Sequence, residues 1–145
     1  MRFVKPTRVD EVFNSVVGFL TRIGLPLAGS RVLAVRGRSS GEWRTTPVNP
    51  LRVAGAVYLV APRGHAQWVR NLRVAGRGEL RSGLRVTPFT AAEVEDAAKP
   101  PILRAYLKAW AWEVGRFFDG VDASSPDERL LEIAPDFPVF RIERV

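Results

Sequence analysis

The sequence predicts a mainly β protein with helices, an α+β chain of six or seven antiparallel strands with two or three peripheral helices. One observation is a series of short segments, from residue 31 onward, that are rich in β-branched and apolar residues and are bounded by tight turns. The other is that three segments instead space their apolar residues as helices do. Because the strands follow one another as hairpins, an antiparallel sheet or small barrel is favoured over a βαβ arrangement.

The first expected element is an amphipathic helix over residues 10–24, within a single domain of residues 1–145. Asp10 is placed to cap this helix, and Gly24 ends it. Its apolar face would pack on the body of the domain or close over a site as a lid. The helix could also touch a membrane surface, but its polar face carries few cations, so such contact is not expected. The apolar stretch is also too short and too polar to span a bilayer.

Three extended segments are expected next, at residues 31–36, 44–53 and 56–61. A turn at 37–43 joins the first two, and Ala54-Gly55 joins the second to the third as a tight hairpin. Pro47 and Pro50 have no N–H to donate to a neighbouring strand, so their segment is expected at a sheet edge or in irregular pairing.

A short helix at 67–75, a hairpin of residues 78–81 with 84–94, a long helix and a strand at 139–144 complete the prediction. Pro88 predicts an edge or bulged strand. Pro100-Pro101 open the long helix, whose apolar face extends to Phe118, and a loop follows at 119–126. Exposed edges near Pro47 and Pro88 would allow a homodimer.

The composition excludes several kinds of chemistry. The chain has 145 residues, of which 46% are hydrophobic and 26% charged, as in one soluble globular domain. It has no cysteine, which excludes disulfides, thiolate catalysis and cysteine metal sites. The only histidine, His65, argues against zinc, so no metal site is predicted. The lack of cysteine agrees with a reducing compartment, and we expect a cytoplasmic protein.

The positive charge is concentrated in the middle of the sequence. The formal net charge is +7, yet residues 31–85 hold eleven arginines against two acids, which gives +9 there and −2 elsewhere. An arginine-rich genome would explain why arginine replaces lysine, but not why acids are missing from this segment. The local surplus suggests an acidic ligand, a nucleic acid or an anionic membrane.

Two clusters within this segment have the residue types of an anion site. In the first, Gly37 and Gly41 let the backbone approach a ligand closely, Ser39 and Ser40 add hydroxyls, and Arg38 and Arg44 flank the turn. Exposed N–H groups in such a turn form an anion nest. An ordinary hairpin turn with solvated arginines is the alternative.

The second cluster lies one strand later. Arg63 and Gly64 end a strand just before the helix at 67–75, where a helix N-terminus supplies unsatisfied N–H groups suited to an anion. Trp68 and Asn71 share a face of that helix. Trp68 fits core packing, whereas an inward-facing Asn71 needs a backbone or ligand partner.

The order and spacing of these short motifs resemble the deazaflavin-dependent nitroreductases, the family of quinone and nitro reductases that use the deazaflavin coenzyme F-420. The resemblance covers residues 30–80 well and the C-terminal third more loosely. The residues that carry it are Gly37-Arg38-Ser39-Ser40-Gly41, Arg44, Val48-Asn49-Pro50-Leu51, Ala61-Pro62-Arg63-Gly64, Trp68 and Asn71-Leu72-Arg73.

The resemblance implies a split β-barrel related to FMN-binding barrels, with the coenzyme's phosphate and glutamate tail in a basic groove. It would place Arg38, Ser39, Ser40 and Arg44 around that tail. Along or beside the deazaflavin ring it would place Asn49, Pro50, Leu51, Ala61, Pro62, Arg63 and Gly64, with Trp68 and Asn71 in support.

The reaction implied is hydride transfer from the reduced deazaflavin to a small organic acceptor of quinone, nitro or enone type. The cofactor carries the hydride chemistry, and the protein binds and shields it. A side chain could donate a proton to the acceptor, and His65 and Tyr106 are the candidates.

Other readings stay open beside this one. They are a split-barrel protein that binds FMN or deazaflavin without turnover, and a lipid-binding protein that uses the aromatic residues of the long helix. A nucleic-acid module stacking bases on Trp43 or Trp68 is a further reading, but no known nucleic-acid motif is present, so no nucleic-acid partner is expected.

Overall fold

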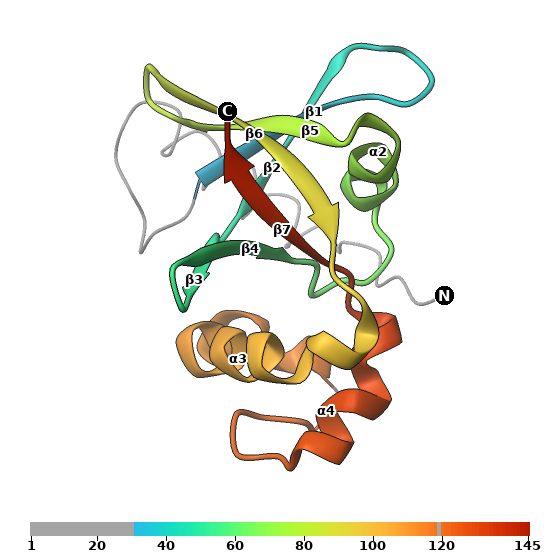
Figure 1. Cartoon of the computed structure of the whole chain (residues 1–145), viewed down its shortest axis with the longest axis vertical. Helices are drawn as coiled ribbons and strands as arrows, with labels where there is room; N and C mark the ends of the chain where they lie inside the picture. Colours follow the sequence, from blue (N-terminus) through green and yellow to red (C-terminus); the bar gives the residue numbers. More distant parts are fainter. Residues whose placement is uncertain (1–30, 119) are drawn as a thin grey trace.

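The computed structural model describes residues 31–118 and 120–145, and the predicted helix at 10–24 lies outside these residues (Figure 1). Seven strands form one antiparallel sheet in the order β2-β1-β5-β6-β7-β4-β3. The strands are β1 (Arg31–Arg36), β2 (Trp43–Val48), β3 (Leu51–Val53), β4 (Ala56–Val60), β5 (Arg77–Ser82), β6 (Arg85–Glu93) and β7 (Val139–Arg144).

The two edge strands of this sheet are neighbours in the sequence. Only Asn49 and Pro50 separate the end of β2 from the start of β3, so those strand ends lie within about 10 Å of each other. A seven-stranded sheet can meet this condition only by curling round on itself. The result is a half-barrel, and the predicted split-barrel α+β fold is confirmed.

Helices cover one side and one end of the half-barrel (Figure 1). Helix α2 (Gln67–Ala75) packs on β1 and ends at Gly76, whose φ of 67° is the left-handed conformation that favours glycine. Helices α3 (Pro100–Val114) and α4 (Asp127–Ile133) form a helical layer below the sheet. Short 3-10 turns flank them, namely η1 (Asp96–Ala98), η2 (Gly115–Phe118) and η3 (Ala134–Asp136).

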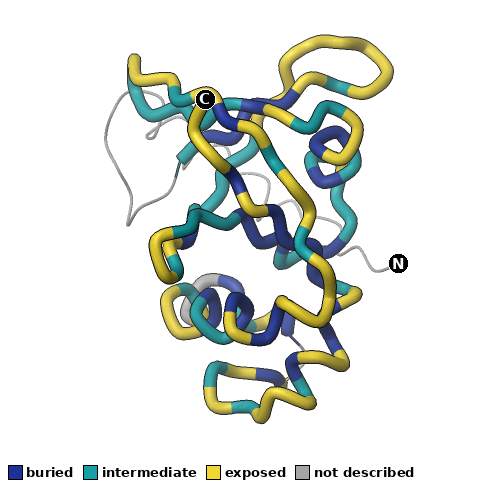
Figure 2. The backbone as a smooth tube through the Cα atoms, in the orientation of Figure 1, coloured by how far each residue is buried: buried dark blue, intermediate teal, exposed yellow. Residues whose placement is uncertain are grey.

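The core has two parts, which appear as the dark segments of Figure 2. One fills the half-barrel, with Leu33, Leu59, Phe89 and Phe140 from its strands and Leu72 from α2. The other joins the helical layer to the strand ends, where Leu51, Val60 and Val139 meet the buried faces of α3 and α4. In this second part the rings of Phe118 and Phe137 stack with centroids 4.1 Å apart.

Some sequence predictions need correction. The extended segment 44–53 is two strands, because Asn49 and Pro50 carry the chain from one sheet edge to the other. Pro47 does lie in an edge strand, as predicted. The edge or bulge prediction for Pro88 is wrong, because β6 pairs with β5 and β7. Its missing N–H costs little there, since the β6–β7 ladder starts only at Phe89.

Helix α4 was not predicted, although its start has recognisable signals. Pro126 precedes it, Asp127 and Glu128 lie in its first turn, and Leu130 and Ile133 are the buried residues. The long helix was predicted as one element to Phe118, but its α-helical part ends at Val114 and continues as a 3-10 turn. No helix within the described ranges is long and apolar enough to cross a membrane.

Candidate functional site: an arginine-lined cavity at the split of the barrel

A cavity of about 690 Å³ is lined on one side by the β1–β2 hairpin and on the other by the β4–α2 loop, α2 and the helical layer. Its size suits a ligand or cofactor of ordinary dimensions. One wall is the β1–β2 turn with β2, and the other is the β4–α2 loop with the start of α2 and parts of α3 and η2. The lining residues are Val35, Gly37, Arg38, Ser39, Ser40, Arg44, Thr45, Thr46, Pro47, Val48, Asn49, Val60, Ala61, Pro62, Arg63, Ala66, Gln67, Trp68, Asn71, Tyr106, Val114, Arg116 and Phe117.

The charge of this lining has one sign. Among the described lining residues there are four arginines, Arg38, Arg44, Arg63 and Arg116, and no aspartate or glutamate. Valines and the rings of Trp68, Tyr106 and Phe117 supply apolar surface between them. Such a cavity suits a ligand that combines a flat apolar group with several negative charges.

Asn71 fixes the glycine-bracketed turn to helix α2. Its side chain is only 5% exposed, and its Oδ1 accepts two hydrogen bonds from Arg38, from the backbone N at 3.1 Å and from Nη1 at 2.8 Å. The predicted inward position of Asn71 is therefore correct, and Arg38 is the partner that it needed. The guanidinium of Arg38 is held in place before any ligand arrives, which lowers the entropy cost of binding.

Hydrogen bonds within the turn occupy much of its backbone. Gly37 N donates to Glu42 O at 2.8 Å, Gly41 N to Gly37 O at 2.9 Å, and Glu42 N to Ser40 Oγ at 3.1 Å. The backbone N–H of Arg38 is bound to Asn71. The backbone N–H groups of Ser39 and Ser40 therefore remain, and they have no hydrogen-bond partner among the described residues. The anion nest expected from the sequence is thus reduced to two N–H groups.

The β4–α2 loop forms the opposite wall. Ala61 N bonds to Pro138 O at 2.9 Å, and Gly64 N closes a turn back to Ala61 O at 3.1 Å. This turn directs Pro62 and Arg63 into the cavity. The first turn of α2 follows, capped by no side chain and free of acids, so its unsatisfied N–H groups add positive potential beside Ala66 and Gln67.

The helical layer contributes side chains that are not among the predicted site residues. Phe117 is stacked by two guanidiniums, with Arg63 Cζ and Arg116 Cζ each 4.6 Å from its ring centroid. Val114 of α3 also lines the cavity, and Gln67 lines it from the first turn of α2. No local signal marks Phe117 and Val114, because an apolar helix face looks the same whether it meets a core or a cavity.

The structure brings most of the predicted site residues together. Eleven line the cavity, namely Arg38, Ser39, Ser40, Arg44, Asn49, Ala61, Pro62, Arg63, Trp68, Asn71 and Tyr106. Their roles toward a coenzyme stay predictions. Trp68 lines the cavity and also packs in the core, where its ring lies on Phe140 with centroids 6.1 Å apart.

Four predicted residues lie outside the cavity lining. Asn49 and Pro50 face opposite sides of the β2–β3 connection, because successive side chains of an extended chain alternate in direction. Asn49 therefore lines this cavity and Pro50 does not. Leu51 is buried in the core under α3. Gly64, with a φ of 90°, forms the loop turn without facing the cavity.

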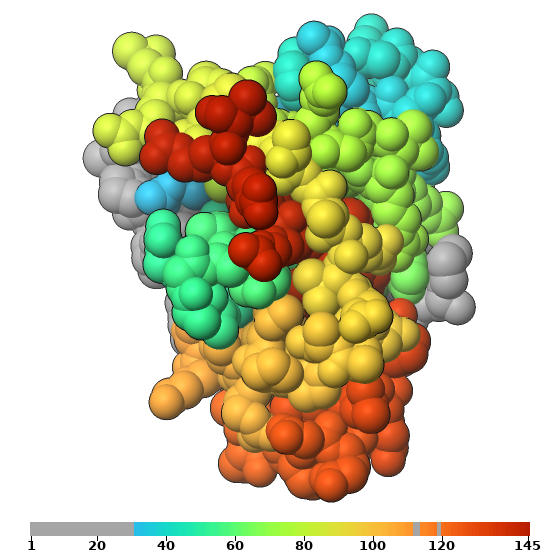
Figure 3. All heavy atoms as spheres, in the orientation of Figure 1, coloured from blue at the N-terminus to red at the C-terminus, as the bar shows by residue number. Residues whose placement is uncertain are grey.

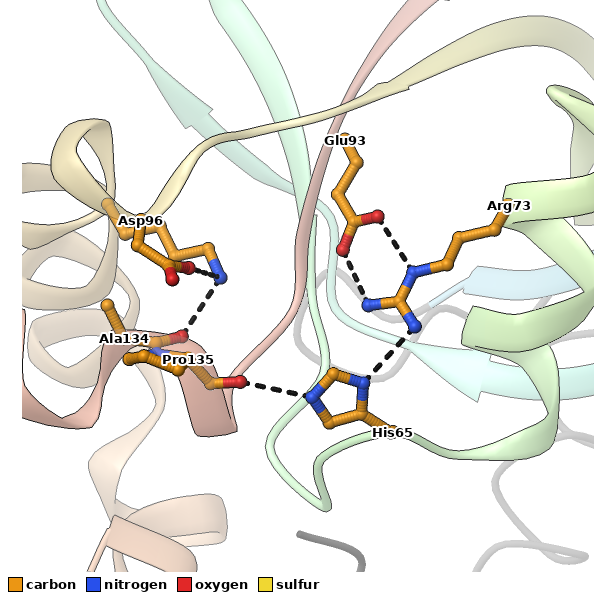
Figure 4. A network of polar contacts seen from close by, with 7 residues as sticks. His65, Arg73, Glu93, Asp96, Ala134 and Pro135 are labelled. Carbon is orange, nitrogen blue, oxygen red and sulfur yellow. Dashed lines mark hydrogen bonds and ion pairs between the residues drawn. The ribbon is translucent and has the colours of Figure 1, made fainter. Parts of the chain in front are cut away.

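His65 is the fourth, and it belongs to a polar network on the outside of the loop (Figure 4). A carbonyl can only accept, so Nε2 donates to Pro135 O at 3.0 Å, and Nδ1 accepts from Arg73 Nη1 at 3.2 Å. Arg73 in turn makes a two-pronged ion pair with Glu93, at 2.7 and 2.6 Å, and this hydrogen bonding raises the pKa of Arg73. His65 therefore connects α2 to the helical layer.

The described residues contain no group of three histidine, aspartate or glutamate side chains that could hold a metal. Comparison with curated proteins gives no significant match. Among solved structures, one described as a domain-swapped dimer matches with a TM-score of 0.59 at 18% identity, covering 93% of this chain and 96% of the other. A structure titled F-420-H2 dependent reductase matches with a TM-score of 0.52 at 20% identity, covering 79% and 94%.

A third structure, of a putative 5-nitroimidazole antibiotic resistance protein from Bacteroides thetaiotaomicron, matches with a TM-score of 0.53 at 12% identity, covering 93% of this chain and 80% of the other. At these identities the three structures show a shared fold. The sequence model of the F-420-H2-dependent quinone reductase family matches residues 8–117, which is more than half of the 145 residues. The chain therefore belongs to the F-420-H2-dependent quinone reductase family.

Proposed function

We propose that the protein binds the reduced deazaflavin coenzyme F-420 in the arginine-lined cavity and reduces a small organic acceptor of the quinone type. The observation that carries this proposal is the lining itself, in which four arginines and no acid surround apolar and aromatic surface. A coenzyme with a flat apolar ring and an acidic tail needs both kinds of surface in one cavity.

Each wall would hold a different part of the coenzyme. Arg38 and Arg44, with the hydroxyls and amides of Ser39 and Ser40, form the more polar wall and would bind the phosphate and acidic tail. Asn49, Ala61, Pro62 and Trp68 would lie along the ring. Asn71 acts through Arg38, whose guanidinium it orients.

When bound, the reduced deazaflavin supplies the hydride. The chain contributes binding, orientation and exclusion of water. Tyr106 is the better placed of the two predicted proton donors, because it lines the cavity and is only 2% exposed. His65 is held in the network outside the lining, so the proposal gives it no part in proton transfer.

Fluorescence titration with the coenzyme tests the binding. We expect quenching that saturates at micromolar coenzyme, and a Kd at least tenfold weaker in the Arg38→Ala variant, since a hydrogen bond to a charged group is worth about 1.5–3 kcal/mol. Arg129→Ala is the matched control, because Arg129 is paired with Glu132 on the surface of α4 and lies away from the cavity. No change in fluorescence with the unmodified protein would overturn the proposal.

Anaerobic turnover tests the reaction. The reduced coenzyme is mixed with a panel of quinones, nitroaromatics and enones, with NADPH as the alternative hydride donor. We expect acceptor reduction with the deazaflavin and none with NADPH. Binding without turnover of any acceptor, or an FMN spectrum in the purified protein, would favour a flavin-binding protein that is not a reductase.

A further inference from the structure

A second cavity of about 740 Å³ lies at the mouth of the half-barrel. It opens at the strand ends that are remote from α2, and it shares no lining residue with the first cavity. The β3–β4 hairpin (green), the β5–β6 hairpin (yellow-green) and β7 (dark red) lie together on this face in Figure 3. The lining residues are Arg31, Pro50, Arg52, Gly55, Ala56, Val57, Leu80, Arg85, Thr87, Phe89, Arg141, Ile142, Glu143 and Arg144.

The floor of this mouth is apolar because inward-facing strand residues reach it. Val57 and Ile142 are paired across β4 and β7. Ile142 and Phe89 belong to the buried core of the half-barrel, and Val57 and Leu80 pack against it. Val57 and Leu80 are only half-buried, so apolar surface stays accessible at the floor. Barrel mouths with such floors are common ligand sites.

The rim is strongly basic. Among the residues that the structure describes, five arginines line the mouth against one acid, Glu143. That acid lies 3.8 Å from Arg141 in a pair whose side chains are 54% and 69% exposed, and so open a pair neutralises little. Arg52, Arg85 and Arg144 are exposed cations that come from three different strands. Their mutual repulsion is relieved when an anion binds among them.

From the apolar floor and the arginine rim we infer that this mouth binds an amphipathic anion, a fatty carboxylate, with its chain on the floor and its head group at the rim. A guanidinium binds a carboxylate through two parallel N–H donors, while the chain gains by leaving water. A neutral lipid would offer no negative charge to Arg85 and Arg144, and a small inorganic anion would leave the apolar floor in contact with water. The site is independent of the coenzyme cavity.

Isothermal titration calorimetry with dodecanoate, kept below its micelle threshold, tests this inference. We expect saturable binding, with dodecan-1-ol at least tenfold weaker because it lacks the charge. The double variant Arg85→Gln/Arg144→Gln should weaken dodecanoate binding about tenfold or more. Both arginines are exposed, so the variant keeps its fold, which circular dichroism checks.

Arg38→Gln, in the first cavity, is the matched control and should leave dodecanoate binding unchanged. Methyl NMR should show dodecanoate shifting Val57, Leu80 and Ile142 but not Val114. Equal binding of the alcohol, loss of binding in Arg38→Gln, or shifts confined to Val114 would each overturn the inference. So would binding to anionic phospholipid vesicles with none to free dodecanoate.

Discussion

The two cavities are both rich in arginine, but they are built differently. In the first cavity Arg38 is hydrogen-bonded to the buried Asn71, and residues from α2, α3 and η2 close one wall. At the barrel mouth Arg52, Arg85, Arg141 and Arg144 are exposed, and the apolar floor beneath them is made of strand residues. The first cavity therefore depends on helices and on fixed side chains, whereas the second depends on the sheet and on the sum of its charges.

The largest expected effect comes from a substitution in the helical layer, which should affect ligand binding in the first cavity and not at the barrel mouth. Phe118→Ala removes one ring of the pair stacked 4.1 Å apart with Phe137, and we expect a loss of about 3–5 kcal/mol in unfolding free energy by urea titration. Because Phe117 of η2 lines the first cavity, coenzyme binding should weaken while dodecanoate binding persists. Equal loss at both cavities would mean that the helical layer supports the whole barrel.

The next effect concerns the two predicted proton donors. Tyr106→Phe should lower kcat about a hundredfold if the phenol donates a proton, without a similar change in coenzyme Kd. His65→Gln should leave kcat near that of the unmodified protein, because His65 does not line the cavity. If His65→Gln were instead the slower variant, the histidine and not Tyr106 would be the proton donor.

Gly78 tests the sheet that the second cavity needs. A Cβ there would lie 2.8 Å from Ala34 O and 3.0 Å from Phe89 Cζ, so Gly78→Ala should destabilise the protein by about 1–3 kcal/mol. Since Phe89 lies in the mouth's floor, dodecanoate binding should weaken more than coenzyme binding. Gly115→Ala is the control, because its nearest contact would be an ordinary 3.9 Å and thermal unfolding should change little.

Asn71 tests whether fixed side chains matter in the first cavity. Asn71→Leu keeps the branched shape of the side chain but removes the Oδ1 that accepts both hydrogen bonds from Arg38, and coenzyme binding should weaken about tenfold. Combined with Arg38→Ala, the loss should be less than the sum of the two single losses, because both substitutions remove the same interaction. Additive losses in the double-mutant cycle would show that Asn71 contacts the coenzyme independently.

The smallest expected effect lies in a loop that lines neither cavity. Hydrogen bonds from the Ser124 hydroxyl and backbone lower the pKa of Asp122. A depressed carboxyl pKa stabilises the fold above the unfolded pKa and loses that contribution as the pH falls through the folded pKa. Ser124→Ala should raise the pKa of Asp122 toward its ordinary value in an NMR titration, with both ligand affinities unchanged.

Local sequence signals predicted the hairpin series well. Turn glycines, β-branched runs and helix-opening prolines act within a few residues, so they placed five of the strands, the helix at 67–75 and the long helix close to where they lie. The same signals placed the arginine turn and the β4–α2 loop in order. They did not separate β2 from β3, since the change of direction at Asn49-Pro50 is set by the curl of the sheet.

The sequence by itself determined which chemistry is available, namely a basic, acid-poor central segment with two glycine-containing turns and no thiol. Only the tertiary structure decided which of those residues face a cavity. Asn49 and Pro50 are adjacent in the chain yet line different cavities, and Phe117 meets Arg63 from a helical layer more than fifty residues away. The physical reason is that the burial and the direction of each side chain are set by packing between distant segments, which local propensity does not encode.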